Sequence, residues 1–235
     1  MKLIDIHCHI LPKVDDGPES VTESIKILKE MKKQGILNVI VTPHYRPEMF
    51  EPSMKRVIYS YRHLRDIAYD MGISMSLGCE YYRNEKLIEH MDNRMRPTMA
   101  GGRYILVEFS MNDLFPTIRN YVYEILTHGY KPIIAHAERY FCCQNLDRIR
   151  ELREMGALIQ LNAGSVIGEE GWKIKKFCLE LMKKDLVDFI ASDTHNIGDR
   201  KLNLKKSASY VSNKMGKQYA ERIFFNNPLN VLKNR

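Results

Sequence analysis

Residues 2–9 read KLIDIHCH, a short apolar run that closes on two histidines, His7 and His9. Such a run predicts a β-strand. Side chains two residues apart on a strand point to the same face, so both imidazoles face one way. The opposite face, toward an expected helix layer, then carries Ile4, Ile6 and Cys8. Two imidazoles at this pitch can chelate one metal ion, although an ordinary surface or core pair explains the spacing equally well.

The same rhythm, a short apolar run followed by an amphipathic one, continues along the chain. Ser20 and Glu23 form a capping box that predicts a helix start, and Gly35 predicts its end. Further predicted helices span residues 52–69, 115–128, 146–155 and 174–184. Predicted strands span residues 2–9, 36–42, 73–80, 103–109, 132–136, 157–162 and 187–192. Seven strands that alternate with helices predict an α/β fold with parallel pairing, as a closed barrel or, alternatively, an open doubly wound sheet.

Composition narrows the class of protein. The chain has 235 residues, 44% apolar and 28% charged, which is typical of a globular protein, and we expect a single domain over residues 1–235. No apolar run reaches about 18 residues and the N-terminus lacks a signal-type run, so we expect a cytoplasmic protein without membrane insertion. The five cysteines are scattered and form no CxxC. The net charge of +7 favours anionic partners, but no long basic run with aromatics indicates nucleic-acid binding.

Acids and histidines stand at the carboxyl ends of six of the seven predicted strands. In a (β/α) barrel these ends meet on one face, where active sites are built. Glu80 and Glu108 lie in strands that should be buried, and a buried carboxylate needs a metal or an ion-pair partner, for which Arg103 and Arg139 are the alternatives. Asp16, in a turn before the first helix, could instead cap that helix.

Nine side chains form the predicted metal-binding set: His7, His9, Asp16, His44, Glu80, Glu108, His136, Asp193 and His195. They are too many for one ion and suit two or three ions of zinc, iron or manganese. Clustered divalent ions activate water and stabilise the attacking and leaving oxygens of a phosphoryl transfer. Arg139 and Arg200 could grip a phosphate, with surface ion pairs, such as Arg139 with Glu138, as the alternative.

The chain resembles the PHP superfamily (polymerase and histidinol phosphatase) of metallohydrolases. Within that superfamily, the chain is similar to the manganese-dependent protein-tyrosine phosphatases of the CpsB and YwqE type, from Gram-positive capsule and exopolysaccharide loci. The resemblance rests on DIHCHI (5–10), DDG (15–17), TPH (42–44), Glu80, LVEFS (106–110), IAHAER (134–139) and ASDTHN (191–196). One departure is the basic stretch KLNLKK (201–206), where the family often has small or proline-rich residues.

The resemblance implies a distorted, TIM-like (β/α)7 barrel, the PHP fold, with three divalent ions, manganese being expected and iron or zinc the alternatives. One ion would be held by His7, His9, Glu80 and Asp193. A second would be held by Glu80, Glu108 and His136, and a third by Asp16, His44 and His195. Arg139 and Arg200 match positions that contact phosphate.

The expected activity is hydrolysis of phosphotyrosine in a protein, by attack of metal-activated hydroxide on phosphorus. The resemblance implies as substrate the tyrosine-rich tail of a cytoplasmic bacterial tyrosine kinase. His44 and Asp193 are candidates to move a proton, although a phenolic leaving group, with a pKa near about 10, needs little help. Alternatives are a histidinol-phosphatase-like phosphomonoesterase, a metal-dependent nuclease or phosphodiesterase, and a non-catalytic kinase-binding protein. The oligomeric state is not predicted.

Residues 142–148 contain a second phosphatase-like pattern, a cysteine followed six residues later by arginine. Cysteine-dependent tyrosine phosphatases have this spacing. The stretch lacks the glycines of a phosphate-binding loop, Asp147 would repel phosphate, and no group that lowers the pKa of Cys142 is evident. We therefore expect Cys142 and Arg148 to have no catalytic role.

Overall fold

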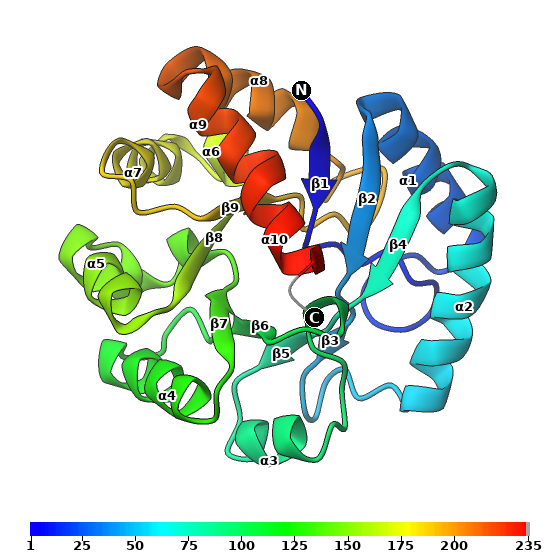
Figure 1. Ribbon diagram of the computed structural model, residues 1–235, viewed down its shortest axis with the longest axis horizontal. Coiled ribbons are helices and arrows are strands. Elements are labelled where there is room, and N and C mark those ends of the chain that lie inside the picture. The colour runs from blue at the N-terminus through cyan, green and yellow to red at the C-terminus, as the bar shows by residue number, and fades with distance from the viewer. Residues whose placement is uncertain (234–235) are drawn as a thin grey trace.

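The computed structural model describes residues 1–233 and confirms an α/β fold in which the named strands pair in parallel (Figure 1). Residues 234 and 235, at the end of the expected unit 1–235, lie outside the described residues. The strands are β1 (Leu3–Asp5), β2 (Ile36–Val41), β3 (His44–Tyr45), β4 (Ser74–Leu77), β5 (Glu80–Tyr82), β6 (Tyr104–Glu108), β7 (Lys131–Ile134), β8 (Leu158–Asn162) and β9 (Phe189–Ala191).

The nine strand segments correspond to the seven predicted strands. β2 continues into β3 across residues 42–43, and β4 continues into β5 across residues 78–79. One sheet has the order β1-β2-β4 and the other the order β3-β5-β6-β7-β8-β9. A parallel bridge between Cys8, after β1, and Thr194, after β9, joins the two. The curled sheet therefore brings the carboxyl ends of all the strands to one side, as the predicted barrel requires.

The barrel is distorted at the end opposite the carboxyl ends of its strands. Within the described residues no pairing joins β4 to β6, and the short helix η1 (Met99–Gly101) contacts both strands instead. A Cβ on Gly78 would lie 2.9 Å from the sulfur of Met99 and 3.0 Å from Ile40 Cγ2, so a larger residue at the bend between β4 and β5 would displace these buried side chains. The C-terminal helix α10 (Asn227–Lys233) crosses this end in Figure 1 and inserts Val231 into the barrel interior.

Helices cover the outside of the sheet. The remaining α-helices are α1 (Val21–Gln34), α2 (Met54–Asp70), α3 (Leu87–Asp92), α4 (Phe115–Thr127), α5 (Leu146–Met155), α6 (Ala163–Ile167), α7 (Trp172–Lys183), α8 (Leu204–Met215) and α9 (Lys217–Glu221). Short turns of other types are η2 (Ala137–Arg139), η3 (Phe141–Cys143) and η4 (Arg222–Asn226). The predicted cap of α1 is present, since the Ser20 side chain accepts a hydrogen bond from the Glu23 backbone. Among the described residues, no helix is long and apolar enough to span a membrane.

The expectation that Ile4 and Ile6 face the helix layer is wrong. Both pack inside the barrel, and only Cys8 joins the cluster beneath the helices. The cause is that β1 ends at Asp5, whose buried carboxylate accepts hydrogen bonds from the backbone of His7 at 3.4 Å and of Ser192 at 3.0 Å. The alternation of side chains therefore breaks after Ile6, where the chain enters the site.

Candidate metal centre

The nine side chains of the predicted metal-binding set meet at the carboxyl end of the barrel. They form four overlapping groups, and within each group the ligand atoms lie within 4.8 Å of one another. The groups are His9, Asp16, His44 and His195; His7, Glu80 and His136; His7, His9 and Asp193; and His44, Glu80 and Glu108. Loops and strands from residue 7 to residue 195 thus supply one continuous cluster.

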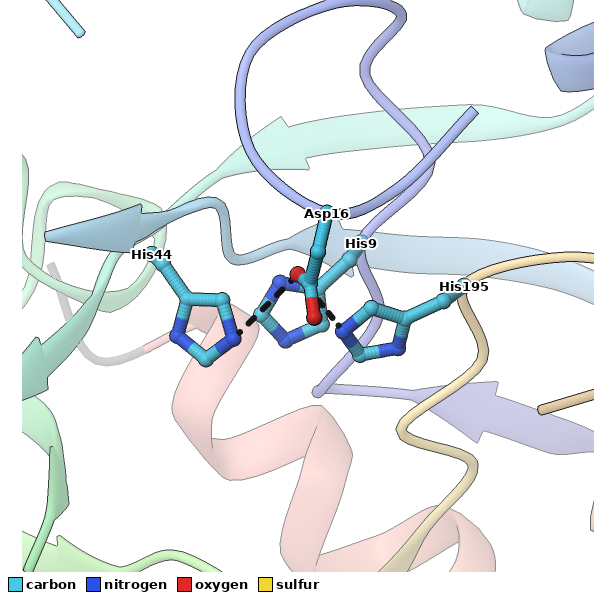
Figure 2. A group of neighbouring side chains, drawn as sticks. All are labelled: His9, Asp16, His44 and His195. Carbon is cyan, nitrogen blue, oxygen red and sulfur yellow. Dashed lines mark ion pairs between the residues drawn. The ribbon is translucent and has the colours of Figure 1, made fainter. Parts of the chain in front are cut away.

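Figure 2 shows the group around Asp16, with three imidazoles gathered about its carboxylate. Asp16 Oδ1 lies 3.5 Å from His44 Nε2 and 3.1 Å from His195 Nε2. The rings of His9 and His195 stack with their centroids 4.0 Å apart. Helix α1 is capped by Ser20, so the alternative role of Asp16 as a helix cap is wrong.

Asp15, which the sequence did not single out, holds this loop in place. Its Oδ2 atom lies 2.9 Å from His9 Nδ1 and accepts the backbone N–H of His44 at 2.9 Å. The hydrogen bond to Nδ1 leaves Nε2 of His9 free to bind a cation. A Cβ on Gly17 would lie 2.4 Å from the carbonyl oxygen of His9, so only glycine lets the loop approach this closely.

Glu80 is the centre of the cluster and is fully buried. Its Oε2 atom lies 3.2 Å from His7 Nε2 and 3.1 Å from His9 Nε2, while Oε1 lies 2.9 Å from His136 Nε2. Contacts of both oxygens with different histidines suit a carboxylate that bridges two ions. Among the described residues, no arginine pairs with Glu80 or Glu108, so the alternative of a structural salt bridge to Arg103 or Arg139 is wrong.

Four buried atoms of the cluster lack a hydrogen-bond partner among the described residues: His44 Nδ1, Glu80 Oε2, Glu108 Oε2 and His195 Nε2. His44 Nδ1 lies 3.1 Å from Glu80 Oε2 without forming a hydrogen bond. Such atoms are costly to bury, and most in folded proteins are satisfied. Divalent cations would satisfy all four, and this mixture of imidazole and carboxylate suits manganese, iron or zinc.

The charges of the cluster shift its pKa values in opposite directions. Burial acts to raise the pKa of Glu80, but the neighbouring His7 and His44 hold it well below its usual value. Burial and the negative charge of Glu80 raise the pKa of Glu108 to about 7. Burial and the nearby His9 lower the pKa of His44 to about 4. His44 is therefore neutral at physiological pH, which is the form that binds a metal ion.

Strand β8 is the one predicted strand without an acid or histidine at its end, and its amide side chains orient ligands from other strands. Gln160 Oε1 lies 3.0 Å from His7 Nδ1 and accepts the backbone N–H of His136 at 2.9 Å. Gln160 Nε2 donates to Asn162 Oδ1, and Asn162 Nδ2 donates to Asp193 Oδ2 at 2.8 Å. Sequence reasoning missed both amides, although two polar residues on an interior strand were a visible signal.

Two of the ligand candidates have left-handed backbone conformations, His136 with a φ of 32° and Asp193 with a φ of 52°. Such conformations are strained for residues other than glycine and cluster at functional sites. The Tyr140 hydroxyl donates to the Ala135 carbonyl at 2.9 Å and lies 3.3 Å from His136 Nδ1. It therefore supports the imidazole from behind the site.

Arg139 and Arg200 border a cavity of about 210 Å³ beside the cluster. Arg139 bonds Glu170 through two of its nitrogens, at 3.1 and 2.6 Å, and Asp193 Oδ2 at 3.1 Å. Arg200 donates to Asp16 Oδ2 at 2.8 Å and to Asp193 Oδ1 at 3.3 Å. Arg139 does not pair with Glu138, but both arginines form ion pairs, as the alternative interpretation expected, with these other carboxylates.

Glu138 instead lies fully buried, and its Oε1 accepts the backbone N–H of Asn162 at 3.0 Å. Burial raises its pKa to about 7. Sequence reasoning named neither this support of β8 nor Glu170, the partner of Arg139.

The cysteine pattern does not build a phosphate site. Arg148 donates to the backbone carbonyl of Cys142, and the N–H groups of Asp147 and Arg148 bond the Asn145 side chain, which caps α5. The expectation that no group lowers the pKa of Cys142 is wrong, because its contact with the thiol of Cys143 lowers that pKa to about 7.

Comparisons with known proteins agree with this geometry. The family model described as capsular polysaccharide synthesis, CpsB/CapC, matches residues 3–233. The tyrosine-protein phosphatase CpsB of Streptococcus pneumoniae is 34% identical over 98% of both chains. The tyrosine-protein phosphatase YwqE of Bacillus subtilis is 31% identical over 92% of this chain and 86% of its own. Crystal structures of YwqE and CpsB have been described as those of metal-dependent tyrosine phosphatases. One chain from them superposes on this chain with a TM-score of 0.92 and is 29% identical to it. The superposition covers 99% of this chain and 95% of the solved one.

Proposed function

This chain belongs to the CpsB/CapC family, and from that premise we propose that it is a metal-dependent protein-tyrosine phosphatase. The observation that carries the proposal is the convergence of nine imidazole and carboxylate side chains beside two arginines at one end of the barrel. The proposal treats the whole chain as one catalytic unit, since the side chains come from residues 7 to 195.

The proposed centre holds three divalent ions, manganese first among the candidates. The ions would be held by His7, His9, Glu80 and Asp193; by Glu80, Glu108 and His136; and by Asp16, His44 and His195. Support comes from the group that contains Asp16, His44 and His195 and from the group of His7, His9 and Asp193. The second set is divided between two groups, because His136 and Glu80 group with His7, whereas Glu108 and Glu80 group with His44. The four buried atoms without partners also favour bound cations. When bound, such ions lower the pKa of water and stabilise negative charge on phosphoryl oxygens.

The chain's own residues bind and orient the phosphoryl group. Arg139 and Arg200 both line the cavity, and each guanidinium keeps N–H groups beyond those it uses toward carboxylates. Asp193 lies between them and fixes both. We propose His44 and Asp193 as the groups that move a proton, on the condition that the bound ions leave them free to do so. Because a phenol has a pKa near about 10, the leaving group needs little protonation.

The proposed substrate is a phosphotyrosyl protein, specifically the tyrosine-rich tail of a bacterial tyrosine kinase in the cytoplasm. Lys201 lines the cavity beside Arg200, and Lys205 and Lys206 follow at the start of α8. A basic rim of this kind would attract a tail that carries several phosphates.

The decisive experiment measures phosphate release from a phosphotyrosyl peptide by the protein as purified, after chelation, and after manganese is returned. We expect activity to disappear with chelation and to return with manganese. Full activity after verified metal removal would contradict a metal mechanism. If the peptide is inert in every state, phosphate release from histidinol phosphate tests one alternative, and cleavage of a nucleic acid, followed by gel electrophoresis, tests the other.

A further inference from the structure

Arg46 follows β3, at one edge of the larger sheet, whereas Arg139 follows β7 and Arg200 follows β9 at the other edge. Arg46 comes two residues after His44, so both side chains leave the strand on the same face. The strand register pairs His44 with Glu80, and Tyr82 with Glu108. Arg46 and Tyr82 therefore stand one step beyond His44 and Glu80 along the strands, level with Glu108.

The side chain of Arg46 is held without a carboxylate partner. Its guanidinium lies over the Tyr82 ring, 4.2 Å from the centroid. None of the described carboxylates forms an ion pair with it, whereas Arg139 and Arg200 each contact two. Its positive charge nevertheless acts on Glu108, where it lowers the pKa against the larger effect of burial. The site thus contains a guanidinium that is close to a ligand candidate and has free hydrogen-bond donors.

The loop that follows Arg46 fixes its backbone. Arg46 N–H donates to the Phe50 carbonyl at 2.9 Å, and Phe50 N–H donates to the Arg46 carbonyl at 2.8 Å. This closure lays the Phe50 ring on the imidazole of His44, with centroids 5.3 Å apart and an angle of 11° between the planes. Arg46 is therefore anchored at its backbone by the loop and at its tip by Tyr82, which limits the entropy it loses on binding a ligand.

We propose that Arg46 is a third substrate-binding arginine, which uses its unpaired guanidinium to bind an oxyanion of the substrate. The oxyanion is either the phosphoryl group itself or a carboxylate beside the phosphotyrosine in the peptide. A planar guanidinium binds either group through paired N–H donors. This proposal rests on the proposed function for the nature of the substrate, but the binding of phosphate tests it separately.

Arg46→Gln is the test variant, and Arg96→Gln is its matched control. Arg96 lies over the Tyr45 ring at the same distance, 4.2 Å, but Tyr45 packs against His90 in the cluster beneath the helices, away from the metal centre. The control therefore removes one charge and one ring contact without touching the site. A second pair, Tyr82→Leu and Tyr82→Phe, removes and retains the ring that supports Arg46.

Two measurements compare the manganese-loaded proteins. Calorimetry gives the Kd of inorganic phosphate. Steady-state kinetics gives KM for p-nitrophenyl phosphate and for phosphotyrosyl peptides in which acidic or neutral residues flank the phosphotyrosine. We expect Arg46→Gln to weaken binding by about tenfold to a hundredfold, Tyr82→Leu to weaken it less, and Arg96→Gln and Tyr82→Phe to leave it unchanged.

The pattern of losses identifies the oxyanion. Weaker binding of phosphate and p-nitrophenyl phosphate assigns Arg46 to the phosphoryl group, whereas a loss confined to the acidic peptide assigns it to a neighbouring carboxylate. Wild-type values for Arg46→Gln with every probe would overturn the proposal, as would equal losses in the Arg96→Gln control. Arg46→Lys, which keeps the charge, provides the same readout if Arg46→Gln fails to fold. A wild-type protein that binds phosphate but hydrolyses nothing would refute the proposed function while the binding comparison still tests Arg46.

Discussion

The thiol of Cys142 differs from the other four cysteines in its surroundings. Cys8, Cys79, Cys143 and Cys178 are buried, and burial raises the pKa of Cys8, Cys79 and Cys178. The pKa of Cys143 is also raised, by its thiol contact with Cys142 and by burial. Cys142 is only partly buried, and the same contact together with Arg148 lowers its pKa to about 7. The thiolate is the reactive form of cysteine, so we expect Cys142 to be the most reactive of the five, although it lies in no phosphate site.

We therefore predict that iodoacetamide modifies Cys142 first, with a rate that rises as the pH increases through about 7, since the thiolate forms above the pKa. Peptide mass spectrometry after short exposures at pH 6 to 9 measures this. The modified protein and Cys142→Ser should both keep most of their phosphatase activity. Complete loss of activity in Cys142→Ser would revive a thiol mechanism.

Among the strands, β8 illustrates how an element without a ligand can determine a metal site. Its two amides connect His7, the backbone of His136, and Asp193, which belong to three other segments of the barrel. Hydrogen bonds of this kind fix the tautomer and direction of metal-binding imidazoles, and their loss typically costs about tenfold to a hundredfold in metal affinity.

Gln160→Met keeps the length of the side chain and removes its hydrogen bonds. We predict that it weakens manganese binding by about tenfold or more, measured by calorimetry on metal-free protein. Asn227→Leu is the control, because it removes one half-buried amide hydrogen bond, to the Asp188 carbonyl at 2.8 Å, at the other end of the barrel. An equal loss of affinity in both variants would mean that Gln160 acts only through general stability.

Local signals in the sequence predicted most of the elements. The Ser20 cap and Gly35, which has a φ of 77°, bound α1 as predicted, and α5 spans the predicted residues 146–155. The break after Asp5 was not predictable, because it depends on a hydrogen bond to Ser192, far along the chain. Helices α3, α6 and α8 to α10 were not predicted either.

At the scale of the whole molecule, the ligand candidates were predictable because parallel strands bring their carboxyl ends together whatever their separation in sequence. The residues around them were not. Asp15, Gln160 and Glu170 act through hydrogen bonds to other side chains, and such partners follow only from the three-dimensional arrangement.

The buried cluster also links metal binding to the stability of the entire fold. Glu80, Glu108 and Asp193 share a small volume, and four buried atoms of the cluster lack partners among the described residues. An ion that binds only the folded state, at about 100 times its Kd, adds about 2.7 kcal/mol to the free energy of unfolding. For a chain of this size that corresponds to a rise in Tm of about 5–10 °C.

We predict a rise in Tm of this size when manganese is added to chelated wild-type protein, measured by calorimetry or circular dichroism. His136→Ala should keep the wild-type circular dichroism spectrum, lose phosphatase activity, and show a smaller rise, because His136 Nε2 is one of the atoms closest to Glu80, at 2.9 Å. Asn227→Leu should begin at a lower Tm and show the full rise, since its amide lies at the opposite end of the barrel. Wild-type turnover by His136→Ala, or a wild-type rise in its Tm, would remove His136 from the metal centre and with it the assignment of Glu80 as a bridge between two ions.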